Sequence, residues 1–367
     1  MEFRRTVRVF YPAGDHRLVL RTEDDWDKDL EPREVTEEGT CYVFPIQTQK
    51  PILYYKPCIY RGQKLTWAQG PNKLLVMTEP DVRPIHPHFF TPHEGKVTKL
   101  FTFPSKHLNR KHRVRVYLPP GYAENTLRYY RVLYTQDGQN LFFPKEAFMG
   151  QDWGVGGTLE LLDAMNAVEE AIVVGIWSAD RMEEYTYPGY EAYGRAMVEE
   201  VKPFVCERFR TLMGPRSSAV MGSSLGGVVS FYLGWEHTQE FHGVIAMSST
   251  FTYKDNLIER VLSEPYRKAR IYLDSGWPGD NYEVTLAMAS ALISRGWVMG
   301  KDLMHLAFPL SEHDEVSWGL RLHIPAQLFG GTAGLQSRRA AGLTQPIPKS
   351  LLGQRPAAVL VREGQKE

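Results

Sequence analysis

Residues 218–237 join two apolar runs through a turn rich in glycine, and no other stretch constrains the fold as strongly. Residues 218–221 have the length and composition of a strand, and residues 228–235 read as the start of a helix. Between them stands Gly222-Ser223-Ser224-Leu225-Gly226-Gly227. A strand that passes directly into a helix is the repeating unit of a parallel sheet, so this stretch predicts an α/β fold.

The chain from residue 99 onward repeats this alternation of strands and helices. Strand-like apolar runs cover 114–118, 131–135, 171–177, 218–223, 243–247, 269–273 and 304–309. Apolar residues with helical spacing cover 158–169, 191–209, 225–237, 282–295 and 315–329. The alternation predicts a mostly parallel sheet that helices cover on both faces.

The first ninety residues follow a different pattern. Short runs rich in Val, Leu, Tyr and Phe, each bounded by Pro, Gly, Asp or Asn, cover 5–11, 17–22, 40–45, 52–59 and 73–78. Close spacing of such runs predicts an all-β sandwich domain over residues 1–92. Residues 93–98 are the expected linker and 99–330 the α/β domain. Residues 331–367, which are poor in aromatic side chains, are expected to form a loosely ordered tail.

Charge and composition argue against several classes of protein. The chain has 43 basic and 43 acidic residues, whereas nucleic-acid and membrane-surface proteins usually carry a basic excess. It contains no apolar run long enough for a membrane span and no secretory signal, so a cytoplasmic location is expected. Three cysteines without a CxxC pair favour neither a disulfide framework nor a zinc site. No metal or cofactor is expected, and the oligomeric state is not indicated.

The glycine-rich turn also carries a candidate nucleophile. Gly222 to Gly226 fits the pattern G-x-S-x-G, and the strand before it and helix after it are the context that a nucleophile elbow requires. The small neighbours allow Ser224 to occupy a tight, strained turn at the carboxyl end of the sheet. The alternative interpretation is a strand–helix turn with no catalytic role.

A serine hydroxyl needs a base that takes its proton, and the base needs an acid that orients it. His313 lies on the loop between the last predicted strand and the last predicted helix, at the same edge of the sheet as Ser224. Two carboxylates lie between them in the chain, Asp274 at a strand end and Asp280 on the loop beyond it. Asp280 is preferred because the acid must reach sideways to the histidine, and it is alternatively only the N-cap of the following helix.

An oxyanion formed during acyl transfer needs two backbone N–H donors. Leu225, which follows the nucleophile at a helix N-terminus, supplies one. The loop after strand 131–135 supplies the second through Gly138 or Gln139.

Loops that should overhang the carboxyl edge of the sheet carry candidate substrate contacts. These are Trp153, Arg181, Tyr185 and Tyr187. Aromatic rings there could stack on sugars or phenolic acyl groups. The competing interpretation of each residue is that it packs within a lid or the core.

Five motifs in order resemble a known family. They are Val116-Tyr117-Leu118-Pro119-Pro120-Gly121-Tyr122, Asp137-Gly138-Gln139-Asn140-Leu141-Phe142, Glu184-Tyr185-Thr186, Gly222 to Gly227 and Glu312-His313-Asp314-Glu315. Residues 99–330 resemble the "Putative esterase" family of α/β-hydrolases, which includes enterochelin, feruloyl and acetyl xylan esterases. The resemblance implies the α/β-hydrolase fold, with the nucleophile at Ser224, the base at His313 and the acid most naturally at Asp280. One departure is Gln136, where many relatives carry His.

The expected function is hydrolysis of a carboxylic ester through an acyl-enzyme. A small-molecule or glycan ester, carbohydrate-linked or aryl, is the expected substrate. The first alternative is a siderophore trilactone esterase of the enterochelin type, and the second is a non-catalytic hydrolase fold that binds glycans or serves as a scaffold. The leading β-domain resembles early-set or glycan-binding modules, and we expect it to tune substrate choice or access.

Overall fold

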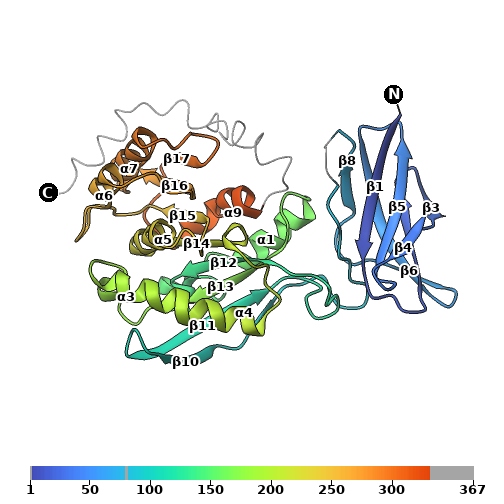
Figure 1. Cartoon of the computed structure of the whole chain (residues 1–367), viewed down its shortest axis with the longest axis horizontal. Helices are drawn as coiled ribbons and strands as arrows, with labels where there is room; N and C mark the ends of the chain where they lie inside the picture. The colour runs from blue at the N-terminus through green and yellow to red at the C-terminus, as the bar shows by residue number, and fades with distance from the viewer. Residues whose placement is uncertain (1, 79–81, 331–367) are drawn as a thin grey trace.

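A computed structural model describes residues 2–78 and 82–330 (Figure 1). It comprises an all-β N-terminal region and a larger region built on a mixed sheet. The predicted tail, 331–367, lies outside the described residues. Within the described ranges, no helix combines the length and apolar character needed to cross a lipid bilayer.

The N-terminal region contains two antiparallel sheets whose apolar side chains share one core. The strands are β1 (Phe3–Phe10), β2 (Arg17–Thr22), β3 (Asp25–Leu30), β4 (Glu34–Thr36), β5 (Cys41–Thr48), β6 (Ile52–Arg61), β7 (Lys64–Trp67) and β8 (Lys73–Val76). One sheet has the order β1-β5-β4 and the other the order β3-β2-β6-β7, with β8 paired to β6. Val9 and Phe44 from the first sheet pack in the same core as Leu20 and Leu53 from the second.

The second region is organised by a sheet of order β10-β11-β13-β12-β14-β15-β16-β17, with β9 paired to β11. Its strands are β9 (Lys96–Val97), β10 (Phe101–Ser105), β11 (Arg110–Leu118), β12 (Arg131–Gln136), β13 (Ala171–Ile176), β14 (Ser218–Ser223), β15 (Gly243–Met247), β16 (Arg270–Trp277) and β17 (Leu303–Pro309). Along the sheet order β13-β12-β14-β15-β16-β17, neighbouring strands are parallel. The pairs β10–β11, β9–β11 and β11–β13 are antiparallel.

Helices cover both faces of this sheet. They are α1 (Val155–Ala164), α2 (Arg181–Glu184), α3 (Gly189–Ala196), α4 (Lys202–Arg208), α5 (Leu225–Glu236), α6 (Leu257–Ser263), α7 (Tyr282–Ser294), α8 (Glu315–Arg321) and α9 (His323–Gly330). Alternate residues of each strand enter opposite cores, as the period of a strand requires. Val244 of β15 packs in the core with α5, while Ile245 packs in the core with Trp318 of α8.

The N-terminal region packs at the amino edge of the parallel strands. Lys73 pairs with Asp163 near the end of α1 (3.0 Å), and Arg83 pairs with Glu169, just before β13. The Tyr11 hydroxyl donates to Glu124, which follows β11 (3.0 Å). Figure 1 shows the N-terminal sheets beside α1. Ser224, by contrast, follows the carboxyl end of β14.

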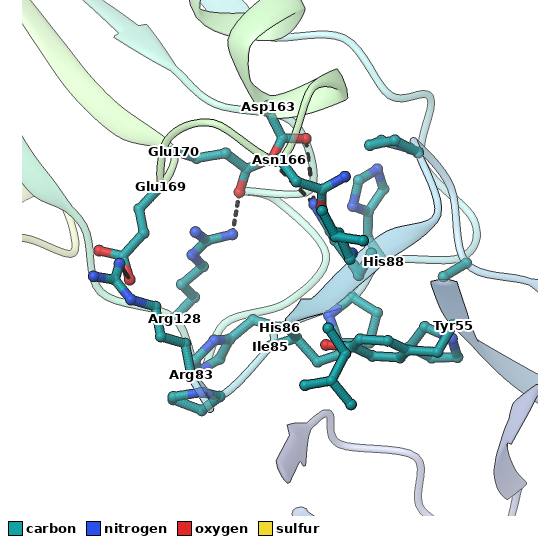
Figure 2. Close-up of a pocket in the computed structure, with 18 of the residues that line it drawn as sticks. Tyr55, Arg83, Ile85, His86, His88, Arg128, Asp163, Asn166, Glu169 and Glu170 are labelled. Carbon is teal, nitrogen blue, oxygen red and sulfur yellow. Dashed lines mark hydrogen bonds and ion pairs between the residues drawn. The ribbon is translucent and has the colours of Figure 1, made fainter. Parts of the chain in front are cut away.

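A cavity of about 170 Å³ lies between the two regions (Figure 2). Tyr55 and His88 line it from the N-terminal side, and Arg128, Asp163 and Glu170 line it from the larger region. Arg128 forms an ion pair with Glu170. The charged side chains of this interface are thus paired with one another, as buried charges must be.

Candidate active site

The turn between β14 and α5 holds Ser224 in a conformation that few residues with side chains adopt. Its φ is 54° and its ψ is −123°. A Cβ atom on Gly222 would lie 2.3 Å from the backbone oxygen of Gly226, so the turn closes only because that position has no side chain. Every residue of β14 is buried, which anchors one end of the turn. The Ser224 hydroxyl is therefore held rigidly at the carboxyl edge of the sheet.

The structure brings together Ser224, His313 and Asp280. His313 Nε2 lies 2.9 Å from Ser224 Oγ, and His313 Nδ1 lies 2.7 Å from Asp280 Oδ1. The imidazole can therefore accept the hydroxyl proton at Nε2 while its Nδ1–H donates to the carboxylate. The loops that follow β14, β16 and β17 supply the three side chains.

Hydrogen bonds keep Asp280 ionised although its side chain is buried. Burial alone raises the pKa of this carboxyl group, but donors from His313, Ser248 and the Gly276 and Asn281 backbones outweigh that effect. They lower the pKa to about 2. A carboxylate that is charged at neutral pH can stabilise the imidazolium that forms when His313 takes a proton.

Asp274, the alternative acid, faces a different partner. Its Oδ1 lies 3.2 Å from Arg321 Nη2, and its Oδ2 accepts a hydrogen bond from the Tyr272 hydroxyl (2.7 Å). Burial raises the pKa of Asp274, and the Arg321 charge opposes that effect. The geometry therefore places Asp280, and not Asp274, against His313.

The loop that follows β12 lies against the first turn of α5. Asp137 adopts a left-handed conformation (φ 54°), after which Gly138–Asn140 form a short 3₁₀ helix. A Cβ atom on Gly138 would lie 2.5 Å from the Gly175 backbone, so this loop packs tightly on β13. Leu225, as the first residue of α5, has an N–H with no acceptor inside that helix. The predicted oxyanion donors, Leu225 with Gly138 or Gln139, thus come from two neighbouring segments.

The four predicted substrate contacts divide into two pairs. Trp153 is 2% exposed and lies beside Trp318, and Tyr185 is fully buried beside Tyr193. Because these rings pack in the interior, the prediction that Trp153 and Tyr185 touch substrate is not supported. Tyr187 is 52% exposed and lines an open groove of about 760 Å³ between α3 and α6.

Arg181 is partly exposed, but its guanidinium group is occupied by Asp137. Nε lies 2.9 Å from Asp137 Oδ1, and Nη2 lies 3.0 Å from Oδ2. Burial raises the pKa of Asp137, and the Arg181 charge opposes that rise. The pair therefore supports the loop after β12 and leaves little free positive charge for an anionic substrate.

Four side chains near Asp280 had no part in the sequence-based prediction. The Ser248 hydroxyl donates to the Asp280 carboxylate, and the Asn281 side chain donates to the Ser248 backbone oxygen. Trp318 and Arg321, both on α8, donate to the Ser248 hydroxyl. The one available signal was positional, because Ser248 directly follows β15 at the edge that carries Ser224. Across the described ranges, no group of three or more His, Cys, Asp or Glu side chains is arranged to hold a metal ion.

Comparison with known proteins finds one curated protein and several solved structures that are similar to this chain. A Bacillus subtilis (strain 168) protein named "Uncharacterized protein YbbA" is 24% identical in an alignment of 192 residues, and the alignment covers 47% of this chain and 70% of that protein. A solved ferulic acid esterase aligns with a TM-score of 0.55 and 21% identity, covering 65% of this chain and 98% of its own. The enterobactin esterase FES from Shigella flexneri aligns with a TM-score of 0.52 and 15% identity, covering 89% of this chain and 93% of its own.

These structural likenesses show an α/β-hydrolase-type fold for the larger region. The family described as "Putative esterase" matches residues 105–300, more than half of the chain. The matched range contains the turn at Ser224 and the loop at Asp280, and His313 follows it. The chain therefore belongs to the "Putative esterase" family and is a carboxylic ester hydrolase.

Proposed function

We propose that this protein is a serine esterase that works through an acyl-enzyme. Ser224 Oγ attacks the ester carbonyl while His313 Nε2 takes its proton, and Asp280 holds His313 with Nδ1–H toward the carboxylate. The N–H of Leu225 and an N–H of Gly138 or Gln139 bind the oxyanion. His313 then protonates the leaving alcohol, and water, activated by the same histidine, hydrolyses the acyl-enzyme.

The observation that carries this proposal is the chain of hydrogen bonds from Ser224 through His313 to Asp280, at 2.9 Å and 2.7 Å. A non-catalytic scaffold has no need of this alignment. Nor does it need the strained φ of 54° at Ser224, which costs free energy without improving packing. Both features therefore favour an active hydrolase over a binding module.

Replacement of the nucleophile tests the mechanism. Ser224→Ala should reduce kcat for an aryl acetate by at least about a thousandfold, since loss of a triad member usually has that effect. The variant should fold normally and lose its reaction with a fluorophosphonate probe. Ser223→Ala is the matched control, because Ser223 is the buried last residue of β14, whereas His313 Nε2 is hydrogen-bonded to Ser224. Activity lost in Ser223→Ala but kept in Ser224→Ala would contradict the proposal.

For the substrate, we propose a carbohydrate-linked or aryl ester. The exposed Tyr187 ring and the open groove that it lines offer a surface on which a sugar or phenolic ring could stack. The aligned ferulic acid esterase acts, by its name, on an ester of that kind. Comparison of kcat/KM for acetyl, feruloyl and simple aryl esters tests this choice, and a Tyr187→Ala variant should weaken only the preference for the larger esters.

A siderophore trilactone is the second candidate substrate. One observation favours it: the likeness to the enterobactin esterase extends over 89% of this chain and so includes the N-terminal region. The pairing of Arg181 with Asp137 speaks against it, because an anionic siderophore calls for unpaired positive charge. Hydrolysis of a catecholate trilactone faster than of feruloyl esters would favour this candidate.

The two-region architecture also supports a division of the chain into domains. We propose that residues 1–92 form a separate β-sandwich domain, 93–98 a linker and 99–330 the esterase domain. Support comes from the single apolar core shared by both N-terminal sheets and from the distinct cores of the larger region.

A further inference from the structure

A buried polar cluster surrounds the carboxylate of Asp280, and its Trp318 ring also packs edge-on against the His313 ring, with 5.0 Å between centroids. It contains Ser248 after β15, Asp274 in β16, and Trp318 and Arg321 on α8. Ser248 and Asp274 are fully buried and Arg321 is 3% exposed. Buried polar groups need hydrogen-bond partners. The partners of Ser248 in this cluster therefore determine where its hydroxyl hydrogen points.

The hydroxyl of Ser248 has three polar neighbours. Its Oγ lies 2.9 Å from Trp318 Nε1, 2.5 Å from Arg321 Nη2 and 2.6 Å from Asp280 Oδ2. The indole and guanidinium nitrogens can only donate, and a hydroxyl has two lone pairs and one hydrogen. Trp318 and Arg321 therefore occupy both lone pairs. The single hydroxyl hydrogen is left to donate to Asp280.

This donation completes the hydrogen bonding of Asp280. Oδ1 accepts from His313 Nδ1 (2.7 Å) and the Asn281 backbone N–H (2.8 Å). Oδ2 accepts from Ser248 Oγ and the Gly276 backbone N–H, both at 2.6 Å. Four donors on two oxygens fix the plane of the carboxylate, and that plane sets where His313 can point.

Arg321 connects Ser248 and the two carboxylates to the loop that carries His313. Its Nη2 lies 3.2 Å from Asp274 Oδ1 and 3.7 Å from Asp280 Oδ2, so one positive charge serves two carboxylates. Its Nη1 donates to Ser311 Oγ (2.8 Å), two residues before His313. The guanidinium group thus fixes the position of Ser248 relative to the loop that carries His313.

We infer that Ser248 is a positioning residue for the triad, which orients Asp280, and through it His313, by a hydroxyl that Trp318 and Arg321 force to donate. This inference rests on the proposed serine mechanism. Across the described residues, no hydrogen bond joins Ser248 directly to Ser224 or His313, so its removal should affect the chemical step and leave the binding of a small ester unchanged.

The test uses two variants that lack the hydroxyl. Ser248→Ala is the direct change, and Ser248→Gly is a second one that suits the positive φ of 46° at this position. Both should lower kcat for an aryl acetate by roughly tenfold to a hundredfold, the loss expected when a hydrogen bond to a charged group is removed. KM should stay within about twofold. The low-field proton resonance of His313 Nδ1–H should shift, because its acceptor is no longer held in one plane.

Two controls separate positioning from general damage. Ser249→Ala removes the next buried hydroxyl, which contacts the Met247 backbone oxygen (3.3 Å) and should leave kcat and the resonance unchanged. In an Asp280→Asn background, Ser248→Ala should lower the rate of fluorophosphonate labelling by less than about twofold, because residues that act through one another are not additive.

The outcomes are distinguishable. Unchanged kcat in both folded Ser248 variants would overturn the inference, as would an equal loss in Ser249→Ala or a full additive loss in the Asp280→Asn background. These results leave the serine mechanism intact if Ser224→Ala is inactive. Activity retained in Ser224→Ala would instead overturn the proposed function itself.

Discussion

Two buried aspartates stand six positions apart at the same sheet edge, and their hydrogen-bond partners assign them different roles. Asp280 accepts four hydrogen bonds, and its pKa falls to about 2 despite burial. Asp274 has fewer donors, and burial raises its pKa while Arg321 opposes the rise. One carboxylate is thus suited to stabilise a charged histidine, and the other to neutralise a buried arginine.

Exchange of each carboxylate for an amide separates these roles. Asp280→Asn should lower kcat by about ten-thousandfold, because an amide can hold His313 in the wrong tautomer. Asp274→Asn should mainly lower the free energy of unfolding, by about 3 kcal/mol, since it leaves Arg321 without its nearest charge partner. Steady-state kinetics and urea unfolding of both variants give the comparison. A large kcat loss confined to Asp274→Asn would reassign the acid.

The sequence predicts some of these residues better than others for physical reasons. Ser224 and His313 follow from a local motif and from chain order, which survive without knowledge of packing. The preference for Asp280 over Asp274 depends on how far the loop after β16 extends toward His313, and no sequence motif specifies that distance. Ser248 was missed because its role is defined by partners on α8, 70 and 73 positions further on. The local sequence around Trp153 does not show that this ring is buried, because its neighbour Trp318 is distant in the chain.

At the scale of elements, the strand–turn–helix unit at β14 and α5 is the part that the sequence predicts most fully. Long apolar runs gave the central strands, since burial on both faces leaves little room for polar residues. Other strands were not predicted, among them β3 and β10. The sequence of β3, Asp-Trp-Asp-Lys-Asp-Leu, is highly charged because this strand lies at the edge of its sheet. The edge strand β10, Phe-Thr-Phe-Pro-Ser, is short and pairs with β11 at the end of its sheet.

A pair of glycine substitutions tests how tightly the elbow is built. A Cβ atom at Gly222 would lie 2.3 Å from the Gly226 backbone oxygen, whereas one at Gly157 in α1 would meet nothing within 4 Å. Gly222→Ala should therefore displace the turn, lower kcat at least about tenfold and destabilise the fold. Gly157→Ala should raise the free energy of unfolding by about 0.5–1 kcal/mol and leave kcat unchanged. Equal behaviour of the two variants would show that the turn tolerates a side chain.

At the scale of the whole molecule, the position of the N-terminal region bears on its expected role in substrate choice or access. A role in substrate choice requires it to reach the carboxyl edge of the sheet, where Ser224 and His313 lie. Its ion pairs and hydrogen bonds instead join it to the amino edge, through Glu124, Asp163 and Glu169 (Figure 1). This placement favours a stabilising role, in which the region supplies ion-pair and hydrogen-bond partners to carboxylates at the amino edge.

The interface between the two regions carries the last prediction, which concerns pH. His88 is 5% exposed at the cavity of Figure 2, and its ring stacks on His93 with 5.3 Å between centroids. Burial lowers the pKa of His88 to about 4, with a further lowering by His93 that Glu124 and Asp163 oppose. The unfolded chain, in which histidine has a pKa near 6.5, therefore binds more protons between pH 4 and 6.5. Stability from His88 is fully present above pH 6.5 and is lost as the pH falls toward 4.

Replacement of His88 by a residue that does not titrate should flatten this dependence. Between pH 7 and pH 5, His88→Gln should lose about 2 kcal/mol less free energy of unfolding than the unmodified chain does, because 1.5 pH units lie between the unfolded pKa and pH 5. Urea unfolding at the two pH values measures the difference. His16→Gln removes an exposed imidazole and should keep the original slope. An unchanged slope in His88→Gln would mean that His88 does not contribute to the pH dependence of the free energy of unfolding between pH 7 and pH 5.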